Sequence, residues 1–228
     1  MAHHAAEPAK YGEEVVFQYE DLDQQQESYQ IGMWAFLVTE VMFFGPLFFI
    51  YFLYRWKYQP DFYLAHKSLD IGIGAFNTVL LLVSSFTVAL AVHYAQKAEF
   101  KKQLACLGVT VACALGFLFV KIVFEYIPKL QHGYFPGPQF AETYHGDANP
   151  GIARIFYSLY FIMTGIHGIH VVIGIGVFSA LMFLVWRRSK GVHNSITDYI
   201  PTEMVGLYWH FVDLVWIFLY PLFYLMPK

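Results

Sequence analysis

Five long apolar stretches divide the chain, at about residues 31–56, 72–95, 104–127, 153–186 and 204–226. Each is long enough to cross the hydrocarbon core of a bilayer, which requires about 20 apolar residues in a helix. Backbone polar groups in lipid must be bonded internally, so these stretches are predicted to be helices. A spanning barrel would instead show alternation in segments of about ten residues. The sequence therefore predicts an all-α membrane protein with a bundle of five transmembrane helices.

Composition supports a membrane class and excludes several others. The chain is 57% hydrophobic and only 14% charged, whereas soluble domains carry about 25% charged residues. A net charge of −3 without a basic stripe argues against nucleic acid as a partner. Cys106 and Cys113 are two helical turns apart, about 10 Å by helical rise, which is too far for a disulfide. We interpret both as packing residues.

The chain divides into a polar, acidic tail at 1–30 and a membrane domain at 31–228. The tail lacks the basic start and apolar stretch of a signal peptide. Basic residues cluster at 97–102 and 187–190, next to helix ends on the side that the N-terminus shares. Because such clusters remain cytoplasmic, the N-terminus is predicted to be in the cytoplasm. The irregular loop rich in Gly and Pro at 128–152 is then on the other side.

Ionisable side chains within the apolar stretches are the most informative residues. Each costs on the order of 3 kcal/mol or more at the bilayer centre unless it is paired, so they should face the bundle interior. Lys121 and Glu125 are four residues apart and are predicted to pair on one helical face. The ionisable residues in or at the ends of the stretches are Glu40, His93, Lys121, Glu125, His167, His170, His210 and Asp213.

Glycines surround the two histidines of the fourth stretch, at Gly165, Gly168, Gly174 and Gly176. Small residues allow a second helix to approach closely in lipid. We therefore expect a neighbouring helix to satisfy these histidines. Glu40, in the first stretch, is expected to be unpaired and therefore largely neutral, because apolar surroundings disfavour an unpaired carboxylate.

Three interpretations compete for the buried polar residues: a metal or haem site, a proton or ion relay, and a hydrogen-bond network that fixes helix packing and holds lipid head groups. We favour the network, because the His-x-x-His pair has no second His or Cys doublet to complete a ligand set. Most aromatic side chains, including Trp209, Trp216 and Tyr224, are interpreted as packing or interface residues.

Two motifs carry a family resemblance. Residues 208–216, Tyr-Trp-His-Phe-Val-Asp-Leu-Val-Trp, resemble the last-helix signature of haem–copper oxidase subunit III, and Glu203 precedes them as in that family. Residues 164–171 resemble its Thr/Ser-Gly-x-His-Gly-x-His-Val segment. The resemblance covers about residues 30–226. Further matches are Glu40 with Phe43 and Phe44, as in the family's Glu-x-x-Phe-Phe helix, together with Asn77 and Glu125.

The resemblance implies an accessory subunit of a terminal oxidase in the bacterial inner membrane, active in aerobic respiration. Such a subunit binds no haem or copper, because these lie in partner subunits. It packs against subunit I, with subunit II as a further partner and a respiratory supercomplex as a wider assembly. It limits inactivation during turnover, supports proton uptake and holds phospholipids. Glu40 resembles the family's carbodiimide-reactive carboxylate. The implied polar network comprises Glu40, Asn77, Glu125, His167, His170, Glu203, His210 and Asp213, with no catalytic, cofactor or metal residue among them.

The chain departs from the seven-helix form of the family because the first two helices are absent. The lipid cleft between those helices and the other five therefore lacks one wall. Residues 208–220 match the cytochrome c branch, which predicts cytochrome c as electron donor. The alternatives are subunit III of a quinol oxidase and an accessory subunit of a nitric oxide reductase. An independent transporter would need a repeat or broken helices, and the sequence indicates neither.

Overall fold

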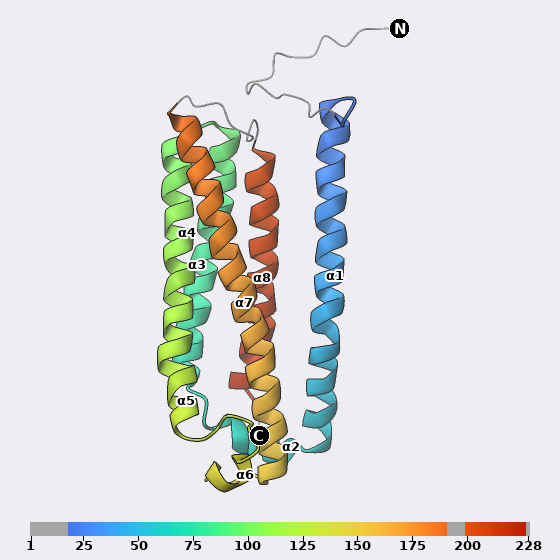
Figure 1. Cartoon of the computed structure of the whole chain (residues 1–228), viewed down its shortest axis with the longest axis vertical. Coiled ribbons are helices and arrows are strands. Elements are labelled where there is room, and N and C mark those ends of the chain that lie inside the picture. Colours follow the sequence, from blue (N-terminus) through green and yellow to red (C-terminus); the bar gives the residue numbers. More distant parts are fainter. Residues whose placement is uncertain (1–17, 191–198, 227–228) are drawn as a thin grey trace.

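The computed structural model describes residues 18–190 and 199–226 of the chain. Throughout these ranges the regular elements are helical, and five helices are long and apolar enough to cross a membrane. The long helices run along the vertical axis of Figure 1, and α2, α5 and α6 gather at one end. The elements are α1 Leu22–Lys57, α2 Gln59–His66, α3 Ile71–Gln96, α4 Phe100–Val120, η1 Lys121–Tyr126, α5 Ile127–Gln131, α6 Phe140–Thr143, α7 Pro150–Ser189 and α8 Ile200–Tyr224.

The five predicted spans are confirmed, and the fourth, α7, is the longest with 40 residues. α4, η1 and α5 form one span from Phe100 to Gln131, in which η1 is a π-helical segment. Both cysteines are free, as predicted. The predicted orientation of the N-terminus stays a prediction.

Capping residues determine where three of the long helices begin. Asp21 caps α1 by accepting a hydrogen bond from the backbone N–H of Gln24 at 2.7 Å. Asp70 and Asn149 cap α3 and α7 in the same manner, and Pro150 opens α7. These side chains satisfy backbone donors that a helix start leaves unpaired. Because Asp21 sets the start, α1 begins at Leu22, within the stretch predicted to be a polar tail.

The core lies among α3, α4, α7 and α8. α8 is central, since 50% of the residues in its most apolar part are buried inside the bundle. In α1 the corresponding share is 11%. The indole N–H groups of Trp209 and Trp216 donate to Ser84 Oγ (2.9 Å) and Thr78 Oγ1 (3.1 Å) on α3. Both indoles are fully buried, so the last helix is joined to α3 by packing and by hydrogen bonds.

α1 lies at the edge of the bundle and contacts α7 and α8 along one side (Figure 1). The hydroxyl of Tyr51 donates to the carbonyl of Leu222 at 2.5 Å, and Phe44 is buried beside Phe211. The opposite side of α1 exposes large apolar residues such as Trp34 and Met42. This exposed side is suited to lipid or to another membrane subunit.

The loop predicted to be irregular closes one end of the bundle. It contains the short helices α5 and α6, and it packs Tyr134 face to face on Tyr157 of α7, with ring centroids 5.1 Å apart. Gly133 has φ of 74°, a conformation that suits glycine. Asp61 of α2 accepts a hydrogen bond from the backbone of Asn149 at 2.9 Å. The loop therefore holds α2 and the start of α7 together.

Candidate functional site

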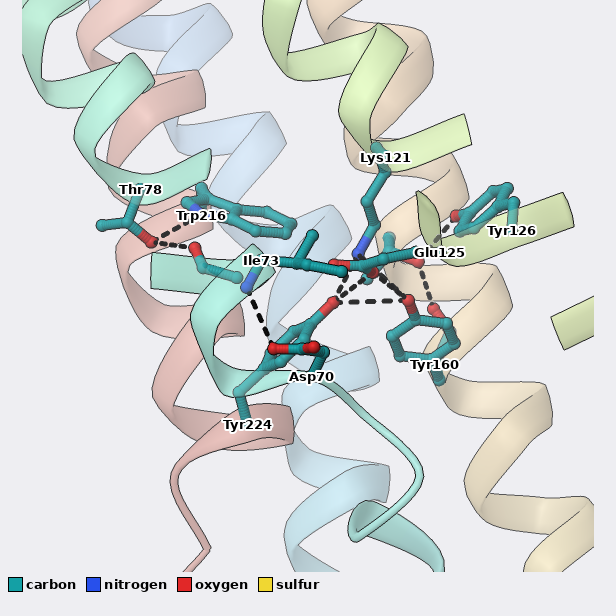
Figure 2. A network of polar contacts seen from close by, with 11 residues as sticks. Asp70, Ile73, Thr78, Lys121, Glu125, Tyr126, Tyr160, Trp216 and Tyr224 are labelled. Atoms are coloured by element: carbon teal, nitrogen blue, oxygen red, sulfur yellow. Dashed lines mark hydrogen bonds and ion pairs between the residues drawn. The ribbon is translucent and has the colours of Figure 1, made fainter. Parts of the chain in front are cut away.

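The first polar contact of the bundle is a buried ion pair on η1 (Figure 2). Lys121 Nζ lies 2.5 Å from Glu125 Oε2, and both side chains are at most 5% exposed. The same ammonium donates to the hydroxyls of Tyr160 (3.1 Å) and Tyr224 (2.7 Å). An ammonium has three N–H donors, so all three are used. The pairing predicted from the four-residue spacing is confirmed.

Two tyrosines complete this cluster from other helices. The hydroxyl of Tyr160, on α7, donates to Glu125 Oε2 at 2.5 Å, and that of Tyr224, on α8, donates to the same oxygen. Lys121 Nζ also lies 4.8 Å from the ring centroid of Trp216 and 4.9 Å from that of Tyr160. Removing a charge from water costs several kcal/mol per ion unless the charge is paired and hydrogen-bonded. The tyrosines supply these bonds and thereby join η1, α7 and α8.

The tyrosines are the members of the cluster that sequence analysis missed. Tyr224 was interpreted with the packing and interface aromatics, yet it is 1% exposed and bonded to the ion pair. Tyr160 is fully buried and was not singled out. Their separations from Lys121, 39 and 103 residues, give no periodic signal. The one sequence signal for these two residues is that a tyrosine in an otherwise apolar span carries a hydroxyl that needs a hydrogen-bond partner.

A second polar contact joins α1 to α7. Glu40 Oε2 lies 3.0 Å from His170 Nε2, and the other ring nitrogen of His170 lies 2.9 Å from the carbonyl of Ile166. The backbone carbonyl of His170 accepts from Tyr208 of α8 at 2.8 Å. The expectation that Glu40 is unpaired is therefore wrong, because the packing of α1 places His170, 130 residues away, opposite it.

The third contact lies between α3 and α8. His210 Nδ1 is 2.7 Å from Ser85 Oγ. Asp213, one turn further along α8, is 3% exposed, and neither of its carboxyl oxygens has a hydrogen-bond partner within the described residues. The three-residue spacing places both side chains on the side of α8 that faces Ser85 of α3, and His210 makes the hydrogen bond to it.

His167 and Asn77 are both buried, and neither has a polar partner among the described residues. Both ring nitrogens of His167 and both amide atoms of Asn77 lack hydrogen bonds in the part of the chain that the structure covers. His167 instead packs against Trp216 at 5.3 Å and against the edge of Phe117 at 5.6 Å. The expectation that a neighbouring helix satisfies both histidines of α7 is thus correct for His170 and wrong for His167.

The glycines of α7 differ in their packing. A Cβ added at Gly174 would lie 2.5 Å from the indole of Trp209, so this glycine permits close contact with α8. A Cβ at Gly165 would make only an ordinary contact with Tyr126. A Cβ at Gly168 or at Gly176 would have no neighbouring atom within 4 Å. The expectation of a close approach along all four glycines holds at one of them.

The remaining polar residues lie near helix ends. Glu203 is in the first turn of α8, where a carboxylate opposes the positive end of the helix dipole. His93 is in the last turn of α3 and lies beside the ring of Tyr94. Among the predicted site residues, Glu125, His210 and the pair Glu40–His170 make separate hydrogen bonds between helices. The other four have no such bond among the described residues: Asn77, His167, Glu203 and Asp213. Across residues 18–190 and 199–226, no group of three or more His, Cys, Asp or Glu side chains is placed to hold a metal ion.

Comparison with known proteins gives a consistent match along the chain. Residues 12–227 match the model of the family described as cytochrome c oxidase subunit III. Similar proteins include cytochrome c oxidase subunit 3 of Bacillus sp. (strain PS3), 30% identical over 86% of this chain and 84% of that protein. Quinol oxidase subunit 3 of Bacillus spizizenii is 30% identical over 86% of both. Cytochrome c oxidase subunit 3 of Alkalihalophilus pseudofirmus is 32% identical over 86% of this chain and 85% of that protein.

Proposed function

Because the chain belongs to the cytochrome c oxidase subunit III family, we propose that it is an accessory subunit of a proton-pumping terminal oxidase and carries no redox centre. The observation that carries this proposal is the family match over residues 12–227. The polar contacts support it. Lys121 is hydrogen-bonded to a carboxylate and two tyrosines, and Glu40 is hydrogen-bonded to a histidine. These polar groups therefore bind one another within the chain. Haem and copper belong to the partner subunits.

The chain's own role in this proposal is mechanical. The Lys121 cluster joins η1, α7 and α8, the Glu40–His170 contact joins α1 to α7, and the His210–Ser85 contact joins α3 to α8. Apolar neighbours in the bundle cannot replace these hydrogen bonds, so each contact favours a single helix arrangement. The resulting rigid surface packs against subunit I, supports proton uptake from the cytoplasmic side and prolongs activity during turnover. Subunit II, phospholipids and a supercomplex are further partners.

We propose cytochrome c as the electron donor and the bacterial inner membrane as the location, with the N-terminus in the cytoplasm. A quinol is the second candidate donor, because relatives named quinol oxidase subunit 3 match the chain at similar identity. A nitric oxide reductase accessory role is the third. It differs from the first two in its catalytic subunit, since oxygen reduction requires the histidine ligands of copper there.

The test is purification of the complete complex from native membranes and measurement of oxygen uptake with reduced cytochrome c and, separately, with quinol. The proposal expects uptake with cytochrome c, with the haem spectrum unchanged when this subunit is stripped, and a shorter active lifetime in the stripped complex. Uptake with quinol alone would contradict the donor assignment. An equal lifetime with and without the subunit would contradict the protective role.

A further inference from the structure

A pocket with a mixed polar and apolar lining lies beside Glu125. Its residues come from the end of the bundle where Figure 1 shows α2, α5 and α6 gathered. Its volume is about 320 Å³. Exposed residues line its outer part, among them Ser68, Asp70 and His132, and two buried charged residues, Glu125 and Lys129, line it further in. The pocket therefore connects the outside of the bundle with the residue that holds Lys121.

The bonding of Glu125 is incomplete on one side. Oε2 accepts all the hydrogen bonds from Lys121, Tyr160 and Tyr224, whereas Oε1 has no hydrogen-bond partner within the described residues. Glu125 is 1% exposed. A buried acceptor left unpaired costs about 1–3 kcal/mol, and more when it is charged. Figure 2 shows Lys121 and both tyrosines meeting this carboxylate, so a missing donor must come from elsewhere.

The charges around the pocket indicate what occupies it. Glu125 and Asp70 are anionic, and Lys121 and Lys129 are cationic, with Lys129 in electrostatic contact with both carboxylates. Equal numbers of opposite charges attract neither an anion nor a metal cation strongly. The lining is mixed, because the charged side chains of Asp70, Glu125 and Lys129 lie among apolar residues such as Ile73 and Phe124, and an acyl chain there would cover charged groups. A neutral ligand that donates and accepts hydrogen bonds fits best, and water takes about 30 Å³ per molecule in the liquid, so several fit.

We propose that this pocket is a hydrated inlet, in which an ordered water donates the hydrogen bond that Glu125 Oε1 lacks and brings the aqueous phase to the buried ion pair. The inlet makes Glu125 the boundary between water and the bundle interior. It also explains how an ion pair is retained in a membrane helix, because the second carboxylate oxygen then has a hydrogen-bond donor. The π-helical turn of η1 contributes by placing the pair at this boundary, as such turns often do at functional positions.

Thiol accessibility in the intact oxidase complex tests the hydration. In a background with Cys106→Ala and Cys113→Ala, Ile73→Cys places a thiol in the pocket wall, and Phe76→Cys places one on the exposed face of the same helix, one turn further in. A small cationic methanethiosulfonate should modify Ile73→Cys at least 100-fold faster, because only a thiol in water ionises. Equal, slow modification of both would overturn the inlet.

High-resolution imaging of the same complex tests the water directly. The proposal expects isolated density within hydrogen-bonding distance of Glu125 Oε1 and further density in the pocket. An empty pocket at a resolution that shows other buried waters would overturn the proposal, and so would an acyl chain or lipid head group filling it. Neither measurement depends on the electron donor, so failure of the proposed function and failure of the inlet are distinguishable.

Discussion

Glu40 and His170 are hydrogen-bonded across the interface between α1 and α7. His170 Nδ1 lies 2.9 Å from the carbonyl of Ile166, which can only accept, so Nδ1 carries a proton. The 3.0 Å contact between His170 Nε2 and Glu40 Oε2 then needs one more proton, on either atom. The pair has no net charge in both cases, which makes it compatible with a membrane interior. This is the one hydrogen bond between side chains of α1 and α7 among the described residues.

Glu40→Ala should weaken the attachment of α1 without altering the haem spectrum. The loss of one hydrogen bond is worth about 1 kcal/mol, and it should appear as easier loss of the subunit in detergent and a shorter active lifetime. Glu40→Gln is the matched control, because its amide can donate to the unprotonated Nε2 of His170. A Gln variant as weak as the Ala variant would contradict the assigned bond.

Lys121→Met should be the most destabilising single change considered. It leaves the Glu125 carboxylate buried without its counter-charge, which typically costs about 3–5 kcal/mol. Thermal dissociation of the subunit from the complex measures the effect. Adding Glu125→Gln should recover at least half of the loss, because the uncharged amide oxygen still accepts from the tyrosines. A double variant no more stable than Lys121→Met would contradict the ion pair.

Gly174→Ala and Gly176→Ala should have opposite effects although they lie on the same helix. The new methyl at Gly174 would press on Trp209 at 2.5 Å, and overpacking of this kind costs about 1–3 kcal/mol. At Gly176 the methyl has open space, and alanine gains up to about 1 kcal/mol of helix propensity. Thermal stability of the two variants in the complex checks this, and equal stabilities would contradict the packing of α7 on α8.

His210→Ala should loosen the contact between α3 and α8 and leave the haem spectrum intact. Its partner is Ser85, 2.7 Å away, so Ser85→Ala should give a similar loss, and the double variant should lose little more than either single one. Such non-additivity is the signature of one shared interaction. Retention of the subunit under detergent is the measurement, and fully additive losses would show that the two residues act separately.

Local features of the sequence predicted the spans and the Lys121–Glu125 pair, because hydropathy and helical spacing act over a few residues. The contacts of Glu40 and the roles of Tyr160 and Tyr224 depend on residues 35 to 130 positions apart. They follow from how the helices pack, which periodicity does not encode. The early start of α1 was missed for another reason. Its first turns are polar, and only the cap at Asp21 marks where they begin.

Metal and haem analysis after this subunit is separated from the purified oxidase shows whether the chain is a structural subunit without a redox centre. Iron and copper should remain with the other subunits in full, and their haem spectrum should not change. Stoichiometric iron or copper on the separated chain would contradict this prediction.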